Sequence, residues 1–171
     1  TGAGVLERNV APPTDHQSLT VLPADLWRQL DAAGPRCRRH YELTIAASAR
    51  PQEIANVEIV RIDSLLDFIN VMTYDYHAGP GTTNFNAPLY AAKGDPPPQF
   101  NVDVTMRAFL DAGVAPAKLL VGIPFYGHGY GNVPSVDDGL FKPGTGKPDG
   151  WHPMDGDWKI LARTRLLDRH Y

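Results

Sequence analysis

An apolar run that ends abruptly in polar side chains constrains this chain more than any other feature. Four bulky apolar residues fall close together: Phe68, Ile69, Val71 and Met72. A short run of this kind is typical of a strand covered on both faces, as the strands of parallel sheets are. Two hydroxyls, a carboxylate and an imidazole follow directly, on Thr73, Tyr74, Asp75 and His77. We therefore expect functional groups at the carboxyl end of this strand, where barrels of alternating strands and helices place their active sites.

A second apolar run, residues 118–127, follows a helix-like segment and ends in Phe125, Tyr126 and Gly127. Two such endings in successive strand–helix units predict an α/β fold in which both endings contribute to one surface. The alternative is that each run is an ordinary core strand whose last polar groups cap the next turn.

The first helix is predicted over residues 15–34. Thr14 and Gln17 have the spacing of a capping box at its start, and Gly34 with Pro35 is a stop signal. A proline inside a helix removes a hydrogen bond and clashes with the preceding turn, so Pro23 predicts a kink or two shorter helices. Five apolar residues share one face of this segment: Leu19, Leu22, Leu26, Leu30 and Ala33.

Three further segments continue the alternation of strands and helices. Residues 41–47 are predicted to form a strand, and residues 51–66 a connector that becomes helical toward its end. Asn101 is placed to cap a helix that runs to Ala112 and ends at Gly113. Four residues of that helix are predicted to face inward: Val102, Met106, Phe109 and Leu110.

Residues 77–100 form a long stretch without clear periodicity, and connections of this length are usually functional or disordered. Aromatic and amide side chains are frequent in and beside it: Tyr76, Phe85, Tyr90, Phe100, Asn84 and Asn86. Flat apolar faces and amide groups are what a sugar ring requires, because the faces cover its axial hydrogens and the amides pair with its hydroxyls. Equally, the aromatic residues could anchor the loop to its own domain.

Composition excludes several classes of function. The 171 residues carry a formal net charge of -3, which gives no sign of a nucleic-acid-binding surface. No segment has the roughly 18 to 20 apolar residues needed to cross a bilayer. Cys37 stands alone, and no histidine pair has the helical spacing of a zinc protease, so neither a disulfide nor a metal or other cofactor is expected. Nothing in the sequence indicates the oligomeric state.

Three motifs in order resemble family-18 chitinases: Met72-Thr73-Tyr74-Asp75, Asn86-Ala87-Pro88-Leu89-Tyr90 and Pro124-Phe125-Tyr126-Gly127. The resemblance implies part of a (β/α)8 TIM barrel, with residues 41–47, 68–75 and 119–127 as its fifth, sixth and seventh strands. It places a partial catalytic domain at residues 1–127. Residues 128–171 would begin the α+β insertion that many members carry after the seventh strand.

The resemblance also implies hydrolysis of chitin, a β-1,4-linked polymer of N-acetylglucosamine, by a substrate-assisted route. Tyr74 would donate a hydrogen bond to the N-acetyl oxygen, and Asp75 would bind a sugar hydroxyl near the scissile bond. Met72 would form part of an apolar floor, and Tyr126 would line the same subsite. His128, where relatives often have arginine, and Asn86 complete the predicted substrate-binding residues.

One departure from the family pattern bears directly on activity. The family's acid ends the motif Asp-x-x-Asp-x-Asp-x-Glu, which is absent from this sequence. Residues 154–159 are the nearest match, but Lys159 stands in place of the glutamate. We expect the chain to begin after the true motif and to be inactive alone. Since polymeric chitin cannot enter a cell, the whole protein is expected to be secreted.

Two other readings stay open. Family-18 relatives include chitinase-like lectins that keep the cleft and lack the glutamate, so a non-catalytic chitin-binding protein is the first. The second is an unrelated barrel enzyme that shares only the arrangement of strands.

Overall fold

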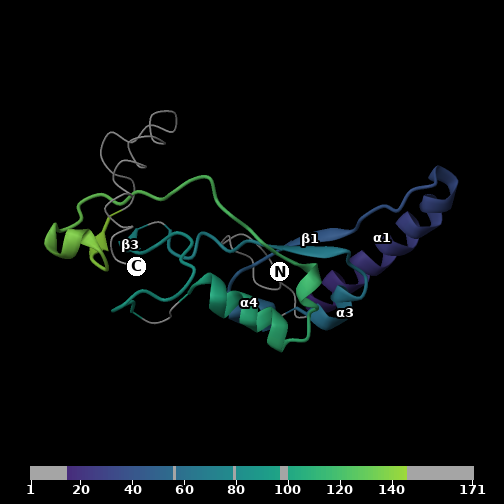
Figure 1. Ribbon diagram of the computed structural model, residues 1–171, viewed down its shortest axis with the longest axis horizontal. Helices are drawn as coiled ribbons and strands as arrows, with labels where there is room; N and C mark the ends of the chain where they lie inside the picture. Colours follow the sequence, from purple (N-terminus) through teal and green to yellow (C-terminus); the bar gives the residue numbers. More distant parts are fainter. Residues whose placement is uncertain (1–14, 56, 79, 97–99, 146–171) are drawn as a thin grey trace. The chain divides into compact units, whose positions relative to one another are not determined.

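The computed structural model describes residues 15–55, 57–78, 80–96 and 100–145. Figure 1 shows strands and helices following one another along the chain. The elements are α1 (Asp15–Cys37), β1 (Thr44–Ala47), α2 (Pro51–Ala55), α3 (Ile59–Asp63), β2 (Phe68–Val71), β3 (Gly81–Thr82), α4 (Val102–Asp111), β4 (Leu119–Val121) and β5 (Pro143–Gly144). The predicted capping box at Thr14 and the acidic look-alike at 154–159 lie outside the described residues.

Three parallel strands form the main sheet, in the order β1-β2-β4. Thr44 pairs with Phe68 and Ala47 with Val71, while Ile69 pairs with Leu119. Helical segments connect each strand to the next, as predicted from the alternating pattern. β2 lies in the centre, and two of its four side chains, Ile69 and Val71, are fully buried.

Each strand is shorter than the sequence predicts. β2 ends at Val71, and two residues later the Thr73 hydroxyl donates to the Gly122 carbonyl at 2.7 Å. β4 likewise ends at Val121, and the Gly122 N–H donates to the Val71 carbonyl at 2.9 Å. The bond from Thr73 therefore links the chain just beyond the carboxyl ends of two neighbouring strands.

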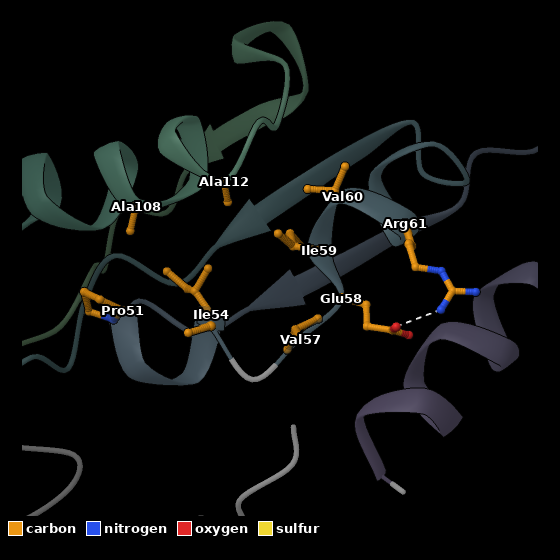
Figure 2. A pocket seen from close by; sticks show the side chains of 10 residues that line it. Pro51, Ile54, Val57, Glu58, Ile59, Val60, Arg61, Ala108 and Ala112 are labelled. Carbon is orange, nitrogen blue, oxygen red and sulfur yellow. Dashed lines mark hydrogen bonds and ion pairs between the residues drawn. The ribbon is translucent and has the colours of Figure 1, made fainter.

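The hydrophobic core lies between the sheet and helices α3 and α4. Eight buried residues form it: Ile54, Ile59, Ile62, Leu66, Ile69, Val71, Phe109 and Val114. Figure 2 shows Ile54, Ile59, Ala108 and Ala112 around an open hollow of about 520 Å³ beside this core. Burial of Val102 and Phe109 confirms two of the predicted inward positions of α4, whereas Leu110 is 41% exposed and that prediction was wrong.

Helix α1 differs from its predicted form at two points. It continues through Pro23 as one helix and passes Pro35 to end at Cys37, so neither the predicted split nor the predicted stop is found. Arg38 adopts the left-handed conformation with φ 50°, and the Arg39 N–H donates to the Gly34 carbonyl at 3.1 Å. This is the Schellman arrangement that ends helices, placed one turn later than glycine and proline indicated.

The chain divides into two compact units. The first, which holds the parallel sheet, comprises residues 1–73 and 103–122, and the second comprises residues 74–102 and 123–171. In the second unit, β3 pairs antiparallel with β5. Beside this pair the Thr83 N–H donates to the Lys142 carbonyl at 2.8 Å. Among the described residues, no helix is long and apolar enough to cross a membrane.

A histidine–carboxylate pair lies near the start of β1. His40 Nε2 and Asp67 Oδ1 are 2.6 Å apart, and the Leu43 N–H donates to the other Asp67 oxygen at 2.7 Å. The hydrogen bond with Asp67 raises the pKa of His40, and nearby Glu42 and Asp31 act in the same direction. The Leu43 N–H, and then His40, lower the pKa of Asp67.

These shifts predict how stability depends on pH. The His40 contribution is complete below its unfolded pKa of about 6.5 and is lost as pH rises through the higher folded pKa. The Asp67 contribution is present above its unfolded pKa of about 3.9 and is lost in more acidic solution. We expect the free energy of unfolding in urea to fall as the pH rises above about 6.5, and His40→Gln to reduce that fall. An equal fall in the variant would contradict the assignment.

Candidate functional site

The Asp75 carboxylate is the centre of a polar cluster in the second unit. Tyr126 Oη donates to Asp75 Oδ2 at 2.7 Å, and His128 Nε2 lies 2.6 Å from Asp75 Oδ1. Residues that follow or end the two apolar runs, Asp75 on one side and Tyr126 with His128 on the other, are therefore in contact. Each carboxylate oxygen can accept more than one hydrogen bond, so both oxygens retain capacity for a ligand hydroxyl.

The backbone of Asp75 is held in an uncommon conformation. Its φ is 58°, in the left-handed region that aspartate tolerates better than most residues. The side chain of Asn86 braces it, because Oδ1 accepts from the Asp75 N–H at 2.9 Å. Asn86 Nδ2 donates to the Tyr126 carbonyl at 3.1 Å. Unusual backbone at a polar cluster of this kind is a common feature of functional sites.

Two rings contact the Asp75 carboxylate, and a third packs against one of them. Tyr74 meets Tyr126 edge to face with ring centroids 6.0 Å apart, and Tyr126 meets His128 in the same way at 5.7 Å. Burial, followed by the hydrogen bond to Asp75, raises the pKa of Tyr126 to about 12. The phenol consequently keeps its proton at physiological pH and acts as a donor to Asp75.

The cluster is open to solvent. The Asp75 side chain is 45% exposed and that of His128 is 28% exposed, while Tyr126 as a whole is 49% exposed. Tyr74 is half-buried. A carboxylate, a phenol and aromatic faces that a ligand can reach are suited to binding a sugar. Among the described residues, no group of three or more His, Cys, Asp or Glu side chains could hold a metal ion.

Comparisons with known proteins identify the family. The sequence pattern of Glycosyl hydrolases family 18 matches residues 6–163. The chain belongs to this family. It is 38% identical to Chitinase A1 of Niallia circulans over 151 residues, which are 84% of this chain and 22% of the relative. It is 33% identical to Chitotriosidase-1 of Mus musculus over 157 residues, which are 89% of this chain and 34% of the relative.

A solved structure of a chitinase supports the same assignment. Chitinase ChiA74 from Bacillus thuringiensis matches with a TM-score of 0.79 and 35% identity, covering 83% of this chain and 23% of that one. The predicted fold class is confirmed: the parallel sheet with its helices is part of a (β/α)8 barrel. The chain spans about a fifth to a third of the length of the curated relatives named above.

The predicted site residues fall into two groups. Tyr74, Asp75, Asn86, Tyr126 and His128 meet in the second unit. Met72 belongs to the first unit, where it is half-buried and its N–H donates to the Ala47 carbonyl at 2.9 Å. The predicted role of Met72 as an apolar floor stays a prediction.

The aromatic residues of the 77–100 segment do not act alike. Tyr76 is 4% exposed and Phe85 is 9% exposed, and the Phe85 ring packs edge to face on Phe141 at 6.5 Å. These two anchor the loop, in agreement with the alternative reading. Tyr90, at 60% exposure, is available to a ligand, and Phe100 lies beside the His77 ring at 6.3 Å.

Sequence reasoning missed how the loop is tied to the rest of the second unit. Tyr130 Oη donates to the His77 carbonyl at 3.1 Å, and burial raises the pKa of Tyr130. Asn84 Nδ2 donates to the buried carboxylate of Asp95 at 2.7 Å.

Proposed function

We propose that the whole protein is a chitinase that hydrolyses β-1,4-linked N-acetylglucosamine polymers, and that this chain supplies part of its sugar-binding cleft. The observation that carries the proposal is the accessible cluster of Tyr74, Asp75, Tyr126 and His128 in a family-18 chain. Because the polymer cannot cross a membrane, the protein acts outside the cell. Residues 128–171 begin the α+β insertion that follows the seventh barrel strand.

The proposed reaction is substrate-assisted and retains the anomeric configuration. The N-acetyl carbonyl oxygen of the substrate attacks the anomeric carbon while an acid protonates the leaving oxygen. Tyr74 donates a hydrogen bond to the acetamide oxygen and so orients it. Asp75 accepts a hydrogen bond from a sugar hydroxyl near the scissile bond. Tyr126 and Met72 supply apolar surface, and His128 holds the Asp75 carboxylate in place.

The acid of this reaction is not among the printed residues, since the motif that carries the glutamate is absent. General acid catalysis contributes about 10² to 10⁴-fold to rate. We therefore propose that the glutamate comes from sequence outside these 171 residues and that the chain alone does not turn over substrate.

A fluorogenic chitobioside tests both halves of the proposal. The full protein is expected to release the fluorophore, and the 171-residue chain is expected to release none above a buffer blank. Turnover by the 171-residue chain would refute the assignment of the acid. A full protein that neither cleaves the chitobioside nor binds N-acetylglucosamine oligomers would refute the chitinase proposal.

A chitin-binding lectin is the second candidate. It would use the same sugar-binding residues, and it differs from the enzyme at the motif position that these 171 residues do not include. The residue that ends the acidic motif in the full protein distinguishes the two: glutamate indicates an enzyme, and a residue that is not an acid indicates a binder.

A further inference from the structure

We propose that Asn86 is a positioning residue that sets the geometry of Asp75 and Tyr126. The inference deepens the proposed function and rests on it, because it assigns a role within the same site. The sequence predicts Asn86 as a substrate-binding residue on the ground that amides pair with sugar hydroxyls. In the structure, both ends of its carboxamide are engaged with main-chain groups.

The partners of Asn86 allow only one orientation of its amide. Asp75 offers a backbone N–H, which needs the carboxamide oxygen, and Tyr126 offers a carbonyl, which needs the nitrogen. Flipping the amide would place like groups against each other and lose both bonds. The main chain of Asn86 is itself fixed, since its carbonyl accepts from the Tyr76 N–H at 3.2 Å.

These bonds close a ring of interactions. Asn86 holds the backbones of Asp75 and Tyr126, which are 51 positions apart, and the side chains of those two residues meet at 2.7 Å. Each link constrains the next, so the direction of the Asp75 carboxylate depends on the Asn86 amide. The left-handed backbone of Asp75 raises this dependence, because such a conformation persists only when its surroundings hold it.

Loss of the two hydrogen bonds of the Asn86 carboxamide should affect the chemical step more than substrate binding. A displacement of about 1 Å in a group that orients the substrate can lower the rate by about 10²-fold. A side chain that contacts the sugar equally in the ground state and the transition state would instead raise KM on removal and leave kcat unchanged. Asn86→Ala is therefore expected to lower kcat of the full protein by about tenfold or more, with KM changing less than about threefold.

A double-mutant cycle with Asp75→Asn supplies the readout that a merely structural role would not move. If Asn86 acts through Asp75, adding Asn86→Ala to Asp75→Asn should lower kcat by less than about threefold further. Two independent contributions would multiply in full and would overturn the inference. Asn132→Ala is the matched control, because Asn132 also has positive φ and its amide donates to Thr145 Oγ1 at 3.0 Å in the same unit.

A second variant keeps the test decisive if Asn86→Ala does not fold. Asn86→Asp has the same shape, retains the acceptor for the Asp75 N–H and loses the donor to the Tyr126 carbonyl. It is expected to lower kcat by about tenfold, and wild-type kcat in this variant would refute the positioning role of Asn86. Absence of turnover in the unmodified full protein would refute the proposed function, which is a separate outcome.

Discussion

Asp75→Asn is expected to lower kcat/KM of the full protein on a chitobioside by about 10²-fold. The substitution removes the negative charge while keeping a residue that tolerates the left-handed backbone at φ 58°. It also weakens the hydrogen bonds from Tyr126 at 2.7 Å and His128 at 2.6 Å, because a neutral amide is a poorer acceptor than a carboxylate. Steady-state release of the fluorophore measures the effect.

Asp103→Asn is the matched control for this carboxylate. Asp103 pairs with Arg107 at 2.9 Å on the surface of α4, in the other compact unit. Since exposed ion pairs of this kind contribute about 0 to 1 kcal/mol, neither stability nor turnover should change noticeably. Equal activities of Asp75→Asn and the wild type would remove Asp75 from the proposed reaction.

The largest expected effect on stability comes from Phe109→Ala, at about 3 to 5 kcal/mol. Phe109 is 1% exposed and belongs to the core cluster that includes Ile62 and Ile69. Removing the ring leaves a cavity that the surrounding helix and sheet cannot fill without moving. The free energy of unfolding in urea, measured on the full protein, is the quantity to compare.

Leu110→Ala provides the comparison one position along the same helix. Leu110 is 41% exposed, so its truncation should lower the free energy of unfolding by about 1 kcal/mol or less. Similar losses for the two substitutions would mean that α4 does not bury the face described above.

Local sequence patterns were sufficient to predict the elements of the sheet. The apolar run from Phe68 and the run from Lys118 each contain a parallel strand, and the helix predicted after Asn101 is present as α4. The connector predicted at residues 51–66 is helical at its start and middle, in α2 and α3, and not at its end. Hydrophobic periodicity works here because a strand or helix in the interior must present apolar groups at a fixed spacing. The motif residues at 74, 75, 126 and 128 could likewise be named in advance, and the structure brings them together.

The ends of elements depended on contacts that sequence spacing does not contain. Just beyond the end of β2, the Thr73 hydroxyl bonds to the carbonyl of Gly122, a residue 49 positions away. α1 ends one turn late because Arg38 takes the left-handed conformation that glycine would be expected to provide. Both outcomes depend on which distant or neighbouring group satisfies a backbone polar atom.

The sequence alone determined the family, the strand–helix order and the chemical types of the groups at the proposed site, because these follow from residue identity and local spacing. Only the tertiary structure decided how Asn86 spans Asp75 and Tyr126, and which loop aromatics are buried instead of available. The physical reason is that hydrogen-bond pairing between segments depends on where folding places each donor and acceptor, which residue identity does not specify.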